Sequence, residues 1–168
     1  MHLEYKEVEG FEFVKIGQAV MSDTPIVAKG TSGNYKLTFE SFHLDFLTAE
    51  QSTYLVYEDE DLIYVGYYSG SFKDRWLRKQ NDIYYFWHSD NIDDYCNKVL
   101  LENGSNITIW LSVDPYAKTH NDVDVNISKY LEDKIIMTKK PKLNKVAISL
   151  EENKKNTLPV KEILRAIK

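Results

Sequence analysis

The side chains that could do chemistry in this chain are two tyrosines, an arginine, a glutamate and an asparagine that follow one another along the sequence. Arg75 lies eleven residues after Tyr64, and Glu132 and Asn144 are twelve residues apart. With Tyr54 they offer the groups that hydrolysis of a phosphodiester bond needs. A phenol can orient a water or exchange a proton with it, and a guanidinium matches two phosphate oxygens. One carboxylate can hold a Mg²⁺ ion that keeps several of its waters.

Two strands are expected to carry the tyrosines. Residues 53–57 and 62–66 are rich in β-branched and aromatic side chains, and the acidic stretch 58–61 separates them. This pattern predicts an antiparallel hairpin with a solvated turn.

A helix is expected to follow the hairpin and to carry the arginine. Ser71 and Asp74 have the three-residue spacing of a capped helix start. On a helix, Arg75 and Lys79 share one face because they are four residues apart, and Arg78 lies close by. The sequence therefore predicts a basic helix face beside the tyrosines.

Glu132 falls in a second predicted helix. Residues 127–139 have apolar side chains at helical spacing, and Pro141 comes just after them. Similar reasoning predicts a helix over 90–103, strands over 107–113 and 146–150, a loop over 114–124 and a terminal helix from about 159.

The fold class follows from these elements. The first 50 residues alternate loosely between apolar and polar positions, which predicts a few short strands with a turn over 30–34. Residues 1–168 are therefore expected to form a single α+β domain with a small central antiparallel sheet flanked by helices. Residues 53–144 would form its core, 1–50 a β-rich N-terminal extension, and 145–168 a basic C-terminal extension with a strand and a helix.

Composition narrows the class of protein. A chain of 168 residues suits one domain. Its only cysteine, Cys96, excludes an internal disulfide and a multi-cysteine zinc site. The sequence shows no signal-like segment and no long apolar run, so a cytoplasmic protein without membrane contacts is expected.

Charge is distributed unevenly along the chain. The net charge is −5, but the segment from Asp133 to Lys168 has ten basic and four acidic residues, a charge of +6, which leaves −11 on the rest. Such a segment can attract phosphate to an acidic protein. A solvated lysine-rich tail would explain the same charges.

The order of these residues resembles the GIY-YIG nuclease family. The matching segments are Ser52-Thr53-Tyr54 for the first triplet, Tyr64-Val65-Gly66 for the second, Arg75 for the helix arginine, and Glu132 with Pro141-Lys142-Leu143-Asn144 for the terminal signature. The resemblance covers residues 53–144. Two positions depart from the family pattern: Ser-Thr replaces Gly-Ile in the first triplet, and Lys79 stands four residues after the arginine, where histidine or tyrosine is common.

The resemblance implies a metal-dependent DNA endonuclease of the restriction or phage type. It implies that Tyr64 activates water, that Tyr54 orients water or phosphate, and that Arg75 binds the scissile phosphate. Its catalytic residues would be Tyr54, Tyr64, Arg75, Lys79 and Glu132, with Glu132 holding Mg²⁺ or Mn²⁺ and with DNA contacts from Arg78, Lys139, Lys140, Lys142 and Asn144. Cutting both strands with one site per chain would favour a homodimer or higher homo-oligomer.

Other interpretations stay open at this point. Each of these side chains is also common as a solvated or structural residue, and Asn144 fits a local anchor or a turn. His88 follows an aromatic run and is interpreted as a packing histidine. A catalytically inactive module on the same fold, binding nucleic acid or another protein, and an RNA nuclease are the alternative functions.

Overall fold

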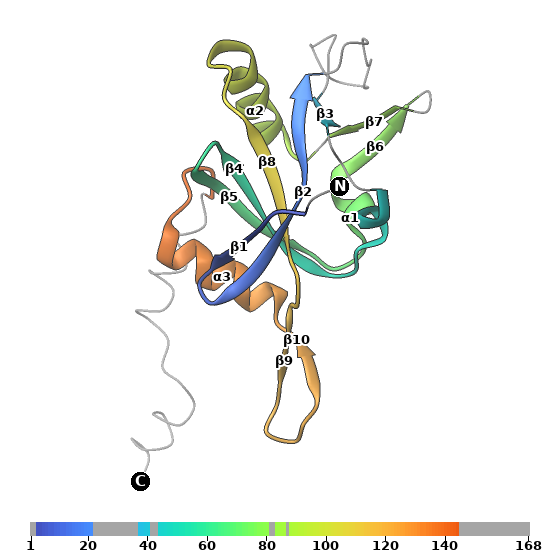
Figure 1. The fold of residues 1–168 in the computed structure, drawn as a ribbon, viewed down its shortest axis with the longest axis vertical. Coiled ribbons are helices and arrows are strands. Elements are labelled where there is room, and N and C mark those ends of the chain that lie inside the picture. Colours follow the sequence, from blue (N-terminus) through green and yellow to red (C-terminus); the bar gives the residue numbers. More distant parts are fainter. Residues whose placement is uncertain (1–2, 22–36, 41–43, 81–82, 87, 145–168) are drawn as a thin grey trace, which may run out of the picture.

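A curled antiparallel sheet organises the molecule (Figure 1). The computed structural model describes residues 3–21, 37–40, 44–80, 83–86 and 88–144. The sheet runs in the order β1-β2-β8-β4-β5, and β3 also pairs with β2. Its strands are β1 (Tyr5–Val8), β2 (Phe11–Met21), β3 (Leu37–Glu40), β4 (Ser52–Glu58), β5 (Asp61–Tyr68) and β8 (Ile107–Ser112).

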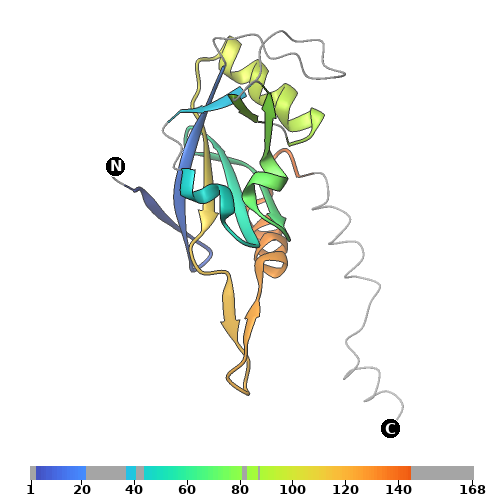
Figure 2. The ribbon, with the colours of Figure 1, turned by 90° about the vertical axis from the view of Figure 1, so that its right-hand side faces the viewer.

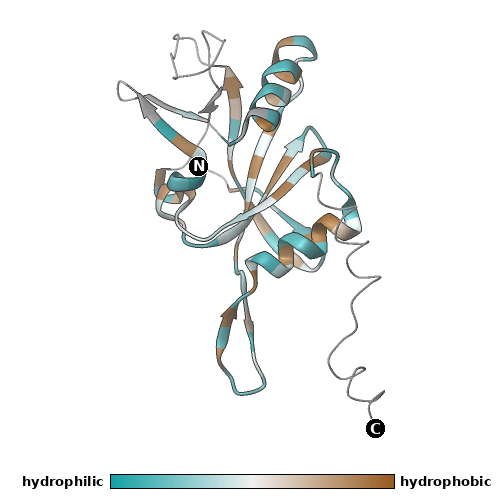
Figure 3. Ribbon diagram, turned by 180° about the vertical axis from the view of Figure 1, so that it is seen from behind, coloured by the Kyte–Doolittle hydropathy of each residue, from teal (hydrophilic) through white to brown (hydrophobic). Residues whose placement is uncertain are grey.

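Helices cover both faces of the sheet (Figures 1 and 2). The short η1 (Leu44–Thr48), α1 (Phe72–Trp76) and α2 (Asp90–Glu102) pack on one face, and α3 (Ser128–Lys139) packs on the other. Hydrophobic and hydrophilic residues alternate around α3 (Figure 3). The molecule is thus α+β, as the sequence predicts, with two apolar layers that hold α2 and α3 against opposite faces of one sheet.

The tyrosine hairpin is confirmed, and its register decides where the two phenols go. Tyr54 pairs with Gly66 and Val56 pairs with Tyr64, and the register shifts between Val56 and Tyr57. Residues two apart on a strand share a face. Because Tyr64 pairs with Val56, two residues after Tyr54, both phenols lie on the sheet face that carries α1 and α2.

The N-terminal strands belong to the same sheet as the hairpin. β2 pairs with β8, which in turn pairs with β4, so β2 lies two strands away from the Tyr54 strand. The predicted turn over 30–34, the strand over 146–150 and the terminal helix from about 159 fall outside the described residues.

Two short hairpins depart from the sequence-based prediction. The helix expected from Ser71 ends at Trp76, and the chain continues as β6 (Leu77–Gln80) paired with β7 (Ile83–Phe86). The predicted loop over 114–124 contains part of a second hairpin, β9 (Tyr116–Lys118) and β10 (Asp124–Asn126), which projects beyond the sheet (Figure 1). The helices over 90–103 and 127–139 and the strand over 107–113 are confirmed within one residue at each end.

No helix in the described ranges is both long enough and apolar enough to cross a bilayer.

Candidate active site at the edge of the sheet

Tyr54 is a buried tyrosine whose ring lies across the paired strand at Gly66. Its side chain is 1% exposed, and its ring packs edge-on against Trp76 at 4.7 Å between centroids. A Cβ atom at Gly66 would collide with the Tyr54 hydroxyl. Gly66 therefore provides the space that the Tyr54 phenol occupies.

His88 joins Tyr54 to Arg75. The Tyr54 hydroxyl lies 2.5 Å from His88 Nε2, and Arg75 Nη2 lies 2.8 Å from the same nitrogen. A guanidinium can only donate, so Nε2 accepts both bonds and the ring proton sits on Nδ1, which donates to Ser89 Oγ at 3.1 Å. Burial, with the charge of Arg75 beside it, lowers the pKa of His88 to about 3. The imidazole is therefore a neutral acceptor that fixes a phenol and a guanidinium side by side.

Tyr64 is the phenol that faces a hollow. It lines a hollow of about 250 Å³ together with Glu132 and Asn144, and its ring centroid is 6.1 Å from Tyr54 and 5.1 Å from His88. Burial raises the pKa of Tyr64, Glu132 raises it further, and Arg75 opposes them. In the structure as it stands, Tyr64 is protonated at neutral pH.

Tyr54 has a still stronger tendency to stay protonated. Burial raises its pKa well above the usual value, the neighbouring Tyr64 adds to this, and Arg75 partly offsets it. Because its hydroxyl is bonded to His88 inside the protein, Tyr54 positions its neighbours and does not face the hollow.

Glu132 projects from α3 into the same hollow. Its side chain is 13% exposed, and Lys129 Nζ lies 2.6 Å from its Oε2. Burial raises the pKa of Glu132, whereas the Lys129 ammonium lowers it. The backbone N–H of Tyr67 is directed toward this carboxylate and also helps to lower its pKa. Lys129 also reaches Asp133 Oδ1 at 2.8 Å, so one ammonium holds two carboxylates.

Three hydrogen bonds from the segment after α3 reach the outer edge of β5. The Asn144 amide accepts from Val65 N–H at 2.9 Å and donates to Val65 C=O at 2.7 Å, and Leu143 N–H donates to Ile63 C=O at 3.0 Å. These bonds satisfy the carbonyl of Ile63 and both outward backbone groups of Val65. An exposed strand edge invites further pairing, and the segment after α3 covers this part of it. Asn144 thus anchors the chain after α3.

Arg75 faces a second hollow on the side of α1. This hollow, of about 380 Å³, is lined by Arg75, Asp74 and the turn after β5. The expectation that Arg75 and Lys79 share a helix face is wrong, because α1 ends at Trp76 and Lys79 lies in β6, paired with Tyr84. The side chain of Lys79 lies outside the part of the chain that the structure describes. His88, from outside α1, bonds to the guanidinium of Arg75.

The basic residues predicted to contact DNA have protein partners. Lys139 pairs with Glu9 at 3.2 Å, and Lys142 pairs with Glu58 at 2.6 Å. The others are Arg78, which donates to the carbonyls of Asp74 and Leu77, and Lys140, an exposed residue in the left-handed conformation that caps α3. Exposed ion pairs of this kind contribute little to stability.

The residues around Glu132 suit only a loosely held metal ion. Mg²⁺ takes oxygen ligands and usually keeps several waters. In the described residues no three histidine, cysteine or acidic side chains form a cluster that could hold a metal. Glu132 and Asp133 could therefore supply one or two oxygens, and water or phosphate would have to complete the shell.

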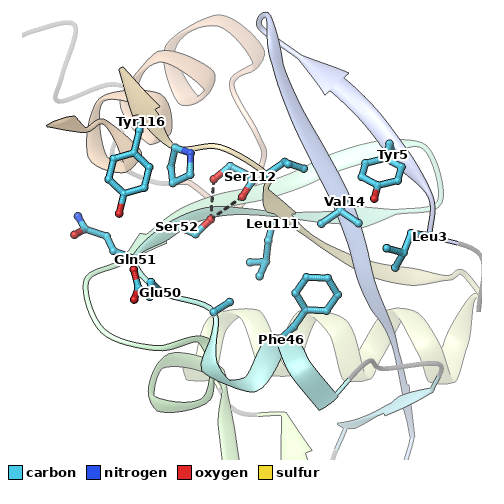
Figure 4. Close-up of a pocket in the computed structure, with 13 residues that line it drawn as sticks. Leu3, Tyr5, Val14, Phe46, Glu50, Gln51, Ser52, Leu111, Ser112 and Tyr116 are labelled. Atoms are coloured by element: carbon cyan, nitrogen blue, oxygen red, sulfur yellow. Dashed lines mark hydrogen bonds between the residues drawn. The ribbon is translucent and has the colours of Figure 1, made fainter. Parts of the chain in front are cut away.

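A more apolar hollow lies away from these residues, near the start of β4 (Figure 4). It measures about 370 Å³ and is bordered by Leu3, Phe46 and Leu111. The hydroxyls of Ser52 and Ser112 at its wall lie 2.7 Å apart and bond to each other. None of the predicted site residues lines it.

Sequence reasoning missed two members of the site. His88 was assigned to packing, and nothing in its aromatic surroundings pointed to a guanidinium partner. Lys129 carried a signal, since a lysine three residues before Glu132 on a helix is placed to pair with it.

Comparison with known proteins adds no relative: no family model, no curated protein and no solved structure matches this chain.

Proposed function

We propose that the protein is a metal-dependent endonuclease that hydrolyses phosphodiester bonds in DNA with a GIY-YIG type of site. The observation that supports this proposal is the convergence of Tyr54, Tyr64, Arg75 and Glu132 around the β5 edge. They come from β4, β5, α1 and α3. Tyr64 shares a hollow with Glu132, and its ring lies 5.1 Å from the ring of His88, which binds Arg75. Packing alone does not require a phenol, a guanidinium and a half-buried carboxylate to meet.

Each residue has a role that follows from its position. Arg75 is held by His88 and lines a hollow, so its guanidinium can bind the scissile phosphate. Tyr64 is the phenol beside the Glu132 hollow and would orient the attacking water and, in its ionised form, take its proton. Tyr54 and His88 lie in the protein interior and position Tyr64 and Arg75 by contact with them.

In the reaction a water oxygen bonds to phosphorus and the bond to the 3′ oxygen breaks. Glu132 would hold the ion, with Asp133 beside it. When bound, Mg²⁺ or Mn²⁺ supplies positive charge that stabilises the phosphate oxygens and favours loss of a proton from a nearby water.

A plasmid assay tests the proposal. With Mg²⁺ the protein should convert supercoiled plasmid to nicked or linear DNA, and EDTA should stop the conversion. Glu132→Gln should lose cleavage and keep DNA binding. The matched control is Glu102→Gln, an exposed helix carboxylate paired with Lys98 on α2. Full cleavage by Glu132→Gln would contradict the metal role of Glu132.

A second function is favoured by one observation. The Lys129–Glu132 ion pair already neutralises the carboxylate that a metal needs, which suits a catalytically inactive binding module on the same fold. Such a protein would shift DNA in a gel or bind another protein without cutting. An RNA nuclease is separated from a DNA nuclease by offering both substrates at matched salt, because phosphate binding weakens with salt for each.

A further inference from the structure

Lys129 forms an ion pair with the proposed metal ligand, Glu132. Its ammonium lies 2.6 Å from Glu132 Oε2 and 2.8 Å from Asp133 Oδ1, and its side chain is 56% exposed. It also lies 5.3 Å from the centroid of the Tyr67 ring. Lysine is a mobile point charge on a flexible stem, so it can leave this position without disturbing the fold.

The same carboxylate oxygens cannot bind the ammonium and a divalent ion in the same way at once. Lys129, Glu132 and Asp133 all line the one hollow. The ammonium holds one oxygen of each carboxylate, and its positive charge repels a divalent ion at the remaining oxygens. A metal ion that binds both carboxylates therefore competes with Lys129.

We propose that Lys129 is an internal counter-ion that competes with the divalent metal for Glu132 and Asp133, so that metal enters when Lys129 is displaced. This inference rests on the proposed function, because it assumes that Glu132 is a metal ligand. It adds to that function the expectation that the protein without substrate binds the metal ion only weakly.

The displaced ammonium then has a natural new partner. Lys129 stands on the rim of the hollow beside Tyr67, which also lines the hollow of Arg75. A phosphate bound by Arg75 would lie in the hollow that Tyr67 also lines, and it could pair with the Lys129 ammonium that leaves Glu132. Substrate and metal would thereby favour each other's binding.

Metal titration of single variants tests the inference without any cleavage. Mn²⁺ binding is followed by electron paramagnetic resonance in the wild type, Lys129→Met and Lys129→Arg. Removing the ammonium should tighten Mn²⁺ binding by roughly two- to fivefold, the scale of a partly exposed ion pair. Lys129→Arg keeps a cation and should bind Mn²⁺ about as the wild type does. Lys98→Met, which removes an exposed lysine paired with Glu102 on α2, should change nothing.

Glu132→Gln separates the two ways in which the result can fail. If Glu132→Gln abolishes Mn²⁺ binding and Lys129→Met leaves the wild-type affinity unchanged, the counter-ion role is overturned and the metal role of Glu132 stands. If Glu132→Gln binds Mn²⁺ as well as the wild type, or if neither the wild type nor Lys129→Met binds it, both proposals are overturned. Far-UV circular dichroism of each variant shows that the titrated protein is folded.

A further titration, with a short phosphorylated DNA strand present, tests whether substrate and metal favour each other's binding. The DNA strand should tighten Mn²⁺ binding more in the wild type than in Lys129→Met, because only the wild type has an ammonium to transfer. Equal effects in the two proteins would overturn the transfer of Lys129 to phosphate.

Discussion

Single side chains in this site are tuned by burial more than by charge. Burial is the largest cause of the raised pKa of Tyr54, Tyr64 and Glu132 and of the lowered pKa of His88. All four groups are therefore held toward their neutral forms. The charges of Arg75 and Lys129 act against this tendency for the phenols and for the carboxylate respectively.

The first prediction concerns stability and His88. The folded pKa of about 3 lies below the usual histidine pKa of 6.5, so between these pH values the unfolded chain binds the proton that the folded protein excludes. The contribution of His88 to stability is complete above the unfolded pKa and is lost as pH falls toward 3, at up to about 1.4 kcal/mol for each pH unit. Urea unfolding of the wild type should therefore lose more stability between pH 7 and 4.5 than unfolding of His88→Gln. Parallel curves would contradict a buried neutral histidine.

The second prediction concerns the pH dependence of cleavage. If Tyr64 takes the proton from water, it acts as a phenolate, and its raised pKa makes that form scarce at neutral pH. Single-turnover cleavage should rise with pH across about pH 7 to 9, up to tenfold per unit where this ionisation alone limits the rate. Tyr64→Phe should be far slower and should lose the rise. A pH-independent rate in the wild type would exclude this role.

At the scale of elements, the site depends on the pairing of β4 with β5 and on the contacts that cover the outer edge of β5. Gly66 leaves the space for the Tyr54 phenol, and Asn144 binds both backbone groups of Val65. Each contact joins segments that are distant in the sequence. Removing either should loosen the site without touching a charged group.

Gly66→Ala should displace the Tyr54 ring, since the new methyl group has no room beside its hydroxyl. Overpacking of this kind costs roughly 1–3 kcal/mol, which urea unfolding would measure. Gly70→Ala is the matched control, because its Cβ would make only an ordinary contact at 3.7 Å with Asp74 Oδ2. Equal stability of the two variants would show that the phenol does not need this space.

Asn144→Ala should expose the edge of β5 at Val65. The variant loses two hydrogen bonds, each contributing about 0.5–1.5 kcal/mol. Amide hydrogen exchange at Val65 should become faster, whereas Asn103→Ala, at an exposed residue after α2, should leave it unchanged. Unchanged exchange at Val65 in Asn144→Ala would mean that the anchor is not needed.

The sequence predicts the long elements and misses the short ones for identifiable reasons. The tyrosine hairpin has two runs of β-branched and aromatic residues, and the segment 127–139 has apolar side chains at helical spacing, so their type and approximate bounds follow from the pattern. Residues 77–80 contain good helix formers, yet they pair with 83–86, because strand pairing overrides local helix propensity there. The strands around 116–126 are short and exposed and lack an apolar pattern.

The site was only partly predictable for a related reason. Tyr54, Tyr64, Arg75 and Glu132 could be chosen by their order. In the structure Tyr54 and Arg75 both bond to His88, and Tyr64 and Glu132 line one hollow. His88 and the space at Gly66 depend on strand register and on a contact between segments 34 residues apart. A single sequence does not specify either.

At the scale of the whole molecule, charge separates into an acidic body and a basic end. The segment from Asp133 onward carries +6 and the rest −11. Part of the basic segment is already paired with the body, as Lys139 is with Glu9 and Lys142 with Glu58. A DNA partner and a two-fold assembly remain proposals that rest on the site, and DNA binding should weaken steeply with salt if these lysines contact phosphate.

The central claim is that side chains from β4, β5, α1 and α3 act as one catalytic unit. The most direct test is the single-turnover cleavage rate of a DNA duplex with Mg²⁺ for Tyr64→Phe, Arg75→Ala and the double variant. Residues that act as a unit are strongly non-additive, so the double variant should be about as slow as the slower single variant. Losses in rate that multiply independently, or wild-type rates in both single variants, would contradict the claim.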